Sequence, residues 1–197
     1  MWNIEILGTD LYHFVASFII YSMLGWLVES IYMSICNKKL TNRGFFLSPF
    51  CPIYGFGAVF GTLFLHPFSG NIIILYVSGS IIATAFEFLV GKLMIKLFGE
   101  LWWDYNNKPF NYKGIICLES SIAWGFYAII IILFLNRVVE SFINRYPHNI
   151  GIMACRMLLL VFGIDFVYHL VIALGINVKK YREKIVDKYH SSKARWY

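Results

Sequence analysis

Five long apolar stretches dominate this sequence and leave few folds open to it. The hydrocarbon core of a bilayer is about 30 Å thick, and roughly 20 residues of α-helix cross it. Within lipid, a helix satisfies its backbone hydrogen bonds inside its own segment, which an isolated extended strand does not. The sequence therefore predicts an all-α, polytopic transmembrane helix bundle with about five spans, at residues 11–36, 45–66, 71–98, 114–136 and 152–176.

The overall composition agrees with a membrane location. Of the 197 residues, 59% are hydrophobic and only 14% are charged, and the mean hydropathy is +0.65. A typical soluble domain is about half apolar and about a quarter charged. We therefore predict a transmembrane domain over residues 1–176, a basic amphipathic cytoplasmic tail over residues 177–197, and a multi-pass protein of the inner or plasma membrane.

Basic residues are distributed unevenly among the connections, and this predicts the topology. Lysines and arginines are concentrated after the first and third apolar stretches and in the C-terminal tail, while the N-terminal segment and the second connection have none. Basic connections tend to stay in the cytoplasm. The N-terminus is therefore expected outside and the C-terminus inside, although Arg137 and Arg145 in the fourth connection run against the pattern.

Two segments of the chain resemble each other. NRGFFLSPFCPIYGFGAV matches NYKGIICLESSIAWGFYAI at an offset of 70, which aligns Tyr54 with Trp124. Upstream, Glu29 and Glu87 lie in the preceding apolar stretches at an offset of 58. This pattern favours a parallel repeat of two helices per unit (helices 1–2 and 3–4), and internal repeats often frame the central site of a transporter. Chance matching in an aromatic-rich sequence is the competing interpretation.

Ionisable residues inside the apolar stretches are the strongest functional signal. A charged side chain at the bilayer centre costs a few kcal/mol, so it normally faces protein or water. At about 1.5 Å per residue, five such groups share a depth between the bilayer centre and the cytoplasmic face, namely Glu29, Glu87, Glu119, Asp165 and His169. We predict one polar interior cluster that binds a proton, a cation or a substrate, with Arg43 or Lys113 as its counter-charge. The alternative is a set of neutral or paired groups that only fix helix packing.

Two segments have unusual compositions, one inside the second apolar stretch and one in the third connection. The stretch SPFCPIYGFGAVFG contains Pro49 and Pro52, which remove backbone donors and disturb a helix. A broken helix at membrane depth is tolerated where it meets protein or a water-filled cavity. The stretch GELWWDYNNKPFNYKG is rich in aromatic residues, which is typical of an interfacial belt. A docking surface for a cytoplasmic partner is the other interpretation of the second stretch.

Motifs of several enzyme classes are missing. The four cysteines lie in or beside different apolar stretches without a C-x-x-C pair, which favours packing over metal or disulfide chemistry. The sequence contains no phosphate-binding loop, no G-x-S-x-G and no H-E-x-x-H. We therefore expect no enzyme activity, no cofactor, no metal site and no nucleic-acid partner. A transport component with Glu29 and Glu87 at its centre is the first hypothesis, and a non-transporting regulator or assembly factor is the second.

Several motifs together resemble a known family. LGWLVES, NRGFFLSPFCPIYGFG, YVSGSIIATAFEF, WWDYNNKPFNYKGIICL and SIAWG are similar to the CmpB-like family of ABC-transporter permeases, also called ABC-transporter type IV. The resemblance implies a bacterial membrane protein that partners a separate cytoplasmic ATPase; a homo-oligomer is left open. Besides Glu29, Glu87 and Arg43, its signature positions here are Gly25, Trp26, Gly44, Pro49, Cys51, Pro52, Gly55, Trp103 and Asp104. Glu119 departs from the basic residue that the family more often has there.

Overall fold

The computed structural model describes residues 2, 4–6, 9–42, 47–99, 101 and 103–173. Within these described residues five long helical units follow one another, and the fourth is a continuous helix with a π-helical middle (η2). The prediction of an all-α bundle is confirmed. The helices are α1 (Leu11–Asn37), α2 (Pro52–Leu65), the short 3-10 helix η1 (His66–Phe68), α3 (Ile72–Phe98), α4 (Leu118–Ile129), η2 (Ile130–Leu135), α5 (Asn136–Asn144) and α6 (His148–Ala173).

Four of the helical units are long and apolar enough to cross a membrane. They comprise Leu11–Asn37, Ile72–Phe98, Leu118–Asn144 and His148–Ile172. The fifth unit, α2, has only 14 residues, which is about 21 Å of helix. It begins at Pro52 and not at residue 45 as predicted. The reason is Pro52 itself, because a proline fits the first helical position, where its missing donor is not needed.

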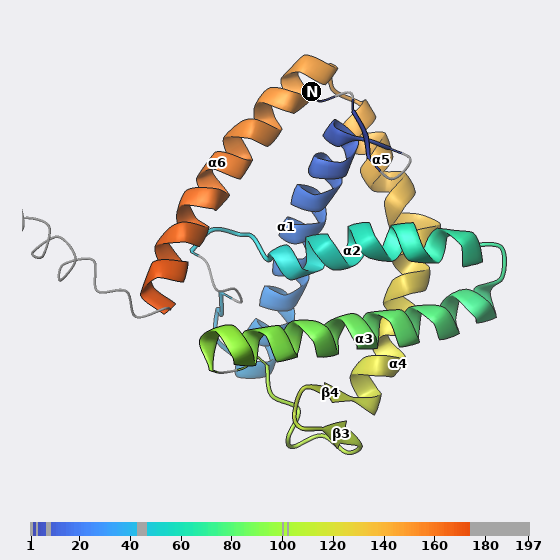
Figure 1. The fold of residues 1–197 in the computed structure, drawn as a ribbon, viewed down its shortest axis with the longest axis vertical. Helices are drawn as coiled ribbons and strands as arrows, with labels where there is room; N and C mark the ends of the chain where they lie inside the picture. Colours follow the sequence, from blue (N-terminus) through green and yellow to red (C-terminus); the bar gives the residue numbers. More distant parts are fainter. Residues whose placement is uncertain are drawn as a thin grey trace, which may run out of the picture.

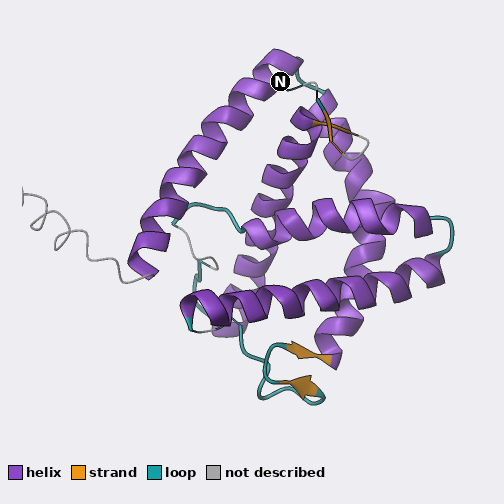
Figure 2. Cartoon of the chain, in the orientation of Figure 1, coloured by secondary structure: helices purple, strands orange, loops and turns teal. Residues whose placement is uncertain are grey.

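The helices pack as two neighbouring pairs. α1 packs mainly against α2, and α3 packs mainly against α4. α2 and α3 are joined through η1, lie side by side, and run across α1 and the α4–α5 helix (Figure 1). Within the described residues, strands are confined to two short hairpins (Figure 2), β1 (Glu5–Ile6) with β2 (Thr9–Asp10) and β3 (Asn111–Tyr112) with β4 (Ile116–Cys117). The second hairpin belongs to the connection between α3 and α4.

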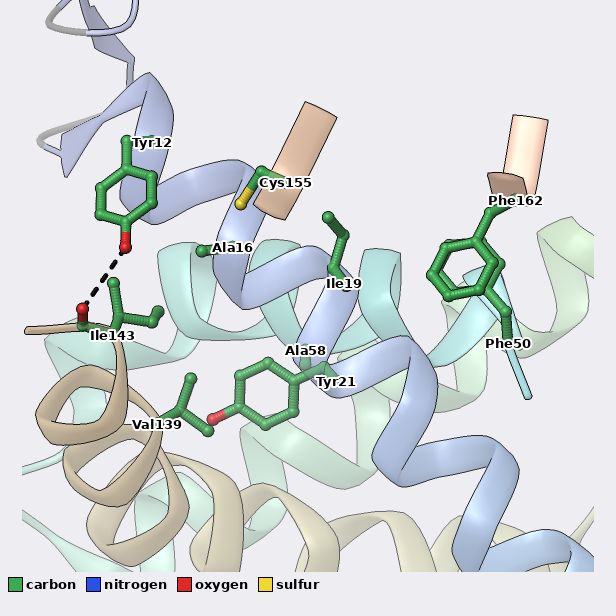
Figure 3. Packing of buried hydrophobic residues seen from close by; sticks show 10 residues of the cluster. All are labelled: Tyr12, Ala16, Ile19, Tyr21, Phe50, Ala58, Val139, Ile143, Cys155 and Phe162. Carbon is green, nitrogen blue, oxygen red and sulfur yellow. Dashed lines mark hydrogen bonds between the residues drawn. The ribbon is translucent and has the colours of Figure 1, made fainter. Parts of the chain in front are cut away.

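Two apolar clusters hold the units together. The larger one joins α1 to α5, to α6 and to the segment before α2 (Figure 3). In it, Phe50 stacks on Phe162 with ring centroids 4.1 Å apart. The smaller cluster forms where α2, α3 and α4 meet, around the fully buried Leu75. Because Phe50 is part of the larger cluster, α6 fixes the non-helical segment that precedes α2.

The start of α1 is capped by Asp10. Its Oδ1 accepts hydrogen bonds from the backbone nitrogen of His13 at 2.8 Å and from His13 Nδ1 at 2.9 Å. Burial alone raises the pKa of Asp10, but the hydrogen bonds from the backbone and ring of His13 lower the pKa below its usual range. An ionised carboxylate at this position also suits the positive end of the helix dipole.

We expect Asp10→Ala to lower the free energy of unfolding by about 1 kcal/mol at neutral pH, since the helix loses its cap. The folded-state pKa of Asp10 is lowered. The stabilisation by its charge is therefore fully present above the unfolded pKa of about 4 and is lost as the pH falls through the folded value. Thermal unfolding in mild detergent from pH 7 to pH 3 measures this. Asp10→Asn keeps the cap without titrating, so its stability relative to the wild type should improve as the pH falls; a constant difference would contradict the electrostatic part.

Candidate functional site

Glu87 lies in the middle of α3, is only 6% exposed, and accepts three hydrogen bonds. Tyr105 from the α3–α4 connection donates its hydroxyl to Oε1 at 3.0 Å. From α4, Trp124 Nε1 donates to Oε2 at 3.0 Å and Ser120 Oγ donates to the same oxygen at 3.2 Å. An ionised carboxylate only accepts hydrogen bonds. The three neighbours can all donate to an ionised Glu87, whereas the burial of its side chain opposes ionisation.

Among the residues that the structure describes, no positive side chain pairs with this carboxylate. Across the described ranges, Glu87 forms no ion pair with a lysine, arginine or histidine. A buried charge without a counter-ion is costly, and hydrogen bonds offset part of that cost. Such a group is prepared to take up a proton or a small cation, because either would neutralise it.

Glu29 lies in the second half of α1 and is partly buried. Tyr54, near the start of α2, donates its hydroxyl to Glu29 Oε2 at 2.9 Å. One helical turn before Glu29, a Cβ added to Gly25 would collide with the Tyr54 ring. Gly25 therefore gives the ring room to reach the carboxylate, which is a packing reason for this signature position.

The two glutamates have corresponding surroundings. Tyr54 donates to Glu29 as Trp124 donates to Glu87, and these pairs obey the offsets of 70 and 58 seen in the sequence. The close glycine contacts follow the same rule, since Gly55 faces Phe18 and Ser22 while Gly125 faces Tyr76 and Ser80. These contacts match the predicted two-helix repeat, which itself stays a prediction.

The two carboxylate sites interact electrostatically through their tyrosines. Tyr54 donates to Glu29 and Tyr105 donates to Glu87, and Tyr105 influences Tyr54 electrostatically. Burial, together with the negative charge of Glu87, raises the pKa of Tyr105 well above its usual range. The Tyr105 hydroxyl therefore stays protonated at neutral pH and remains a hydrogen-bond donor.

Asp165 and His169 form a separate polar group on α6. His169 Nδ1 lies 2.9 Å from Asp165 Oδ1. Asp165 Oδ2 accepts hydrogen bonds from the backbone nitrogen of Ser48, at 2.8 Å, and from the Ser48 hydroxyl. Ser48 precedes Pro49 and the buried Phe50. The described contacts of Asp165 therefore anchor the segment before α2 to α6 and do not reach Glu29 or Glu87.

Glu119 lies on the surface and not in an interior cluster. Its side chain is 63% exposed, and Oε2 lies 2.8 Å from Lys108 Nζ. The hydrogen bond from Lys108 to Glu119 raises the pKa of that lysine. The structure thus does not gather the five predicted groups into one cluster. Glu29 and Glu87 each accept from a tyrosine, Asp165 pairs with His169, and Glu119 pairs with a lysine of the α3–α4 connection.

The remaining signature positions have local structural roles where the structure describes them. Trp26 donates its ring nitrogen to Asn42, Trp103 donates to the carbonyl of the buried Ile115 at 2.8 Å, and Asp104 accepts from the backbone of Asn106. The backbone nitrogen of Cys51, the residue before α2, donates to the Ser22 carbonyl at 3.1 Å. Arg43 and Gly44, and the predicted tail, lie outside the described residues.

The sequence did not identify the donors around the two carboxylates. Tyr54 and Trp124 are visible only as matching positions of the repeat, and Tyr105 as one aromatic residue of a rich connection. The signal that could have found them is the repeat itself, because it places an aromatic donor on the helix that follows each glutamate. In the part of the chain that the structure describes, no group of three or more His, Cys, Asp or Glu side chains is placed to hold a metal ion.

Comparison with known proteins gives one match. A family model described as "Putative ABC-transporter type IV" matches residues 16–170. The matched range runs from the first turns of α1 to the last turn of α6 and covers well over half of the 197 residues. No curated protein and no solved structure gives a significant match.

Proposed function

Because the chain belongs to the family described as "Putative ABC-transporter type IV", we propose that it is the permease subunit of a transporter. The resemblance inferred from the sequence motifs is confirmed by this membership. The multi-pass helical architecture suits such a subunit. In this proposal, ATP is hydrolysed by a separate cytoplasmic partner, and the chain lies in a bacterial cell membrane with its N-terminus outside and its C-terminus inside.

The observation that carries the proposal is the Glu87 carboxylate. Intramembrane carboxylates are expensive and commonly mark ion or substrate pathways. Glu87 combines near-complete burial with three hydrogen-bond donors and no ion pair among the described residues. Glu29 adds a second carboxylate, since its partner Tyr54 interacts electrostatically with Tyr105, the partner of Glu87. We assign to this pair the uptake of a proton or a small cation that accompanies transport.

A regulator or assembly factor remains the alternative function. The observation that favours it is the close packing at two signature glycines, since a Cβ added to Gly25 would collide with Tyr54 and one added to Gly55 would collide with Ser22 and Phe18. In that case the carboxylates would only align α1 with α2 and α3 with α4. The two functions differ in whether loss of the Glu87 charge, with its shape retained, has any consequence.

We expect the full chain, purified in mild detergent from its native membrane, to retain an ATPase subunit that binds nucleotide. The measurement is affinity purification followed by mass spectrometry and an ATP-hydrolysis assay of the purified complex. A variant with Glu119→Gln serves as a matched control, since it removes an exposed charge of the same kind. Recovery of the chain with a sensor kinase or a cell-wall enzyme, and without ATP hydrolysis, would support the regulator instead.

A further inference from the structure

An open groove lies along the second half of α1. Its volume is about 780 Å³, and the described residues that line it are Trp26, Leu27, Ser30, Ile31, Ser34, Ile35, Lys38, Lys39, Leu40, Thr41 and Asn42. Leu27, Ile31 and Ile35 follow one another at a spacing of four and therefore form one stripe of the helix. All three are between 45% and 72% exposed.

The second wall of the groove is the chain that follows α1. Lys38 adopts a left-handed backbone conformation (φ 50°), which reverses the direction of the chain. Thr41 then donates its backbone nitrogen to Ser34 Oγ at 2.9 Å, and Trp26 donates to Asn42 at 2.6 Å. These bonds hold residues 39–42 against the helix, so the groove is built into the fold.

The groove is apolar along its length and positively charged at one end. Lys38 and Lys39 line that end and are both exposed. Neither forms an ion pair with an acidic side chain among the described residues. Leu40 beside them is 94% exposed, which is unfavourable in water and suits the edge of a lipid layer.

The dimensions match one leaflet of a bilayer. From Leu27 to Lys38 the helix rises by about 16 Å, and half of a hydrocarbon core of about 30 Å is about 15 Å. A molecule with an apolar chain along the stripe would therefore place its head beside the lysines. The positive charge of the two lysines requires that this head be anionic.

We propose that this groove is a binding site for an anionic phospholipid of the surrounding membrane. One acyl chain lies along Leu27, Ile31 and Ile35, and the phosphate lies between Lys38 and Lys39. The site is independent of the Glu87 carboxylate, so it stands whether or not the chain transports a substrate. Its occupation would fix the connection between α1 and α2 against α1.

The test measures bound lipid on the full chain purified in a neutral detergent. Phosphatidylglycerol or phosphatidylcholine is added, and complexes are counted by native mass spectrometry. We expect the double variant Lys38→Gln, Lys39→Gln to bind phosphatidylglycerol roughly thirty-fold more weakly, at about five-fold per lysine. Its binding of phosphatidylcholine should not change. The variant Ile31→Gln keeps both lysines and should also weaken phosphatidylglycerol several-fold.

The matched control is Lys92→Gln, Lys96→Gln, which removes the same charge from exposed positions of α3. The tail is identical in all variants, so its contribution cancels. Equal weakening in the α3 variant would mean non-specific attraction and would overturn the site. Unchanged binding of phosphatidylglycerol by the Lys38 and Lys39 variant would also overturn the site. If glycerol 3-phosphate displaced the lipid at a comparable concentration, the site would bind a free phosphate and the acyl-chain part of the proposal would be wrong. If the lipid-free wild type co-purifies with a protein that covers the groove residues, the groove binds a protein partner and the lipid proposal is wrong.

Discussion

Glu87→Gln is expected to abolish the titration of the site while leaving the protein folded. Glutamine keeps the size of the side chain: its carbonyl can accept from Trp124 and Ser120, and its amide can donate to the Tyr105 hydroxyl. It cannot ionise. Because Trp124 Nε1 donates directly to the Glu87 carboxylate at 3.0 Å, neutralisation of Glu87 by a proton or a cation should alter the fluorescence of that tryptophan. The wild type should therefore show a change in emission with pH or with added cation that the variant lacks.

The experiment needs two controls, because the chain contains six tryptophans. Trp124→Phe should remove the emission change without removing the carboxylate, which identifies the reporting residue. Glu119→Gln should behave as the wild type, since that carboxylate is exposed and paired with Lys108. An emission change that persists in Glu87→Gln would separate the titrating group from Glu87 and remove the basis for the proposed function.

Replacement of Glu87 by leucine addresses stability and not titration. Leucine removes the acceptor of the Tyr105 hydroxyl and of Trp124 Nε1, whereas Ser120 can still donate to the Cys117 carbonyl. An unsatisfied buried donor costs roughly 1–3 kcal/mol. Glu87→Leu should therefore lower the unfolding temperature in detergent by clearly more than Glu87→Gln does. If both variants keep full transport activity and differ only in stability, the carboxylate has only a structural role, and the result supports the regulator hypothesis.

Gly55→Ala is expected to disrupt the packing of α2 on α1, with the largest loss of stability of any single methyl addition in α2. An added Cβ would collide with the hydroxyl of Ser22 and would lie 2.5 Å from the backbone carbonyl oxygen of Phe18. A backbone atom inside a helix cannot move aside without shifting the helix. Overpacking of this kind typically costs about 1–3 kcal/mol, and here the separation of α1 from α2 would also pull Tyr54 away from Glu29.

Gly61 provides a matched control on the same helix. Nothing lies within 4 Å of a Cβ added there, so Gly61→Ala should be neutral or should stabilise α2 by up to about 1 kcal/mol through helix propensity. Thermal unfolding of both variants in the same detergent measures the difference. Equal effects of the two substitutions would contradict the close approach of α1 and α2 at Gly55.

Much of the architecture was predictable because the membrane restricts the choices of the chain. An apolar stretch of more than 20 residues can satisfy its backbone only as a helix, so the positions of α1, α3, α4–α5 and α6 follow from hydropathy. The predicted start of α2 was wrong because hydropathy depends on side chains and does not show where the backbone leaves the helical conformation. Its actual start at Pro52 depends on the proline and on the bond from Cys51 to Ser22.

The identity of the two central glutamates was also readable from the sequence alone. A carboxylate inside an apolar helix needs polar neighbours. This argument selects Glu87, which the structure shows to be buried and hydrogen-bonded. The same argument placed Glu119 inside, although it lies at the exposed start of α4 beside Lys108. The depth of a residue along a helix can be counted from the sequence. Whether its side chain is buried depends on which elements pack against that face of the helix, and the sequence does not give this.

Only the tertiary structure decided which groups meet. Ser120 and Trp124 approach Glu87 because α4 packs on α3, and Tyr105 approaches it because the β3–β4 connection folds back over that pair. Asp165 bonds to Ser48, which is 117 residues away, because α6 packs on the segment before α2. The apolar stretches determine that helices form, because in lipid each backbone group needs a hydrogen-bond partner within its own segment. The crossings of those helices depend on close contacts such as Gly55 on Phe18 and Gly25 on Tyr54, which exist only once all the helices are in place.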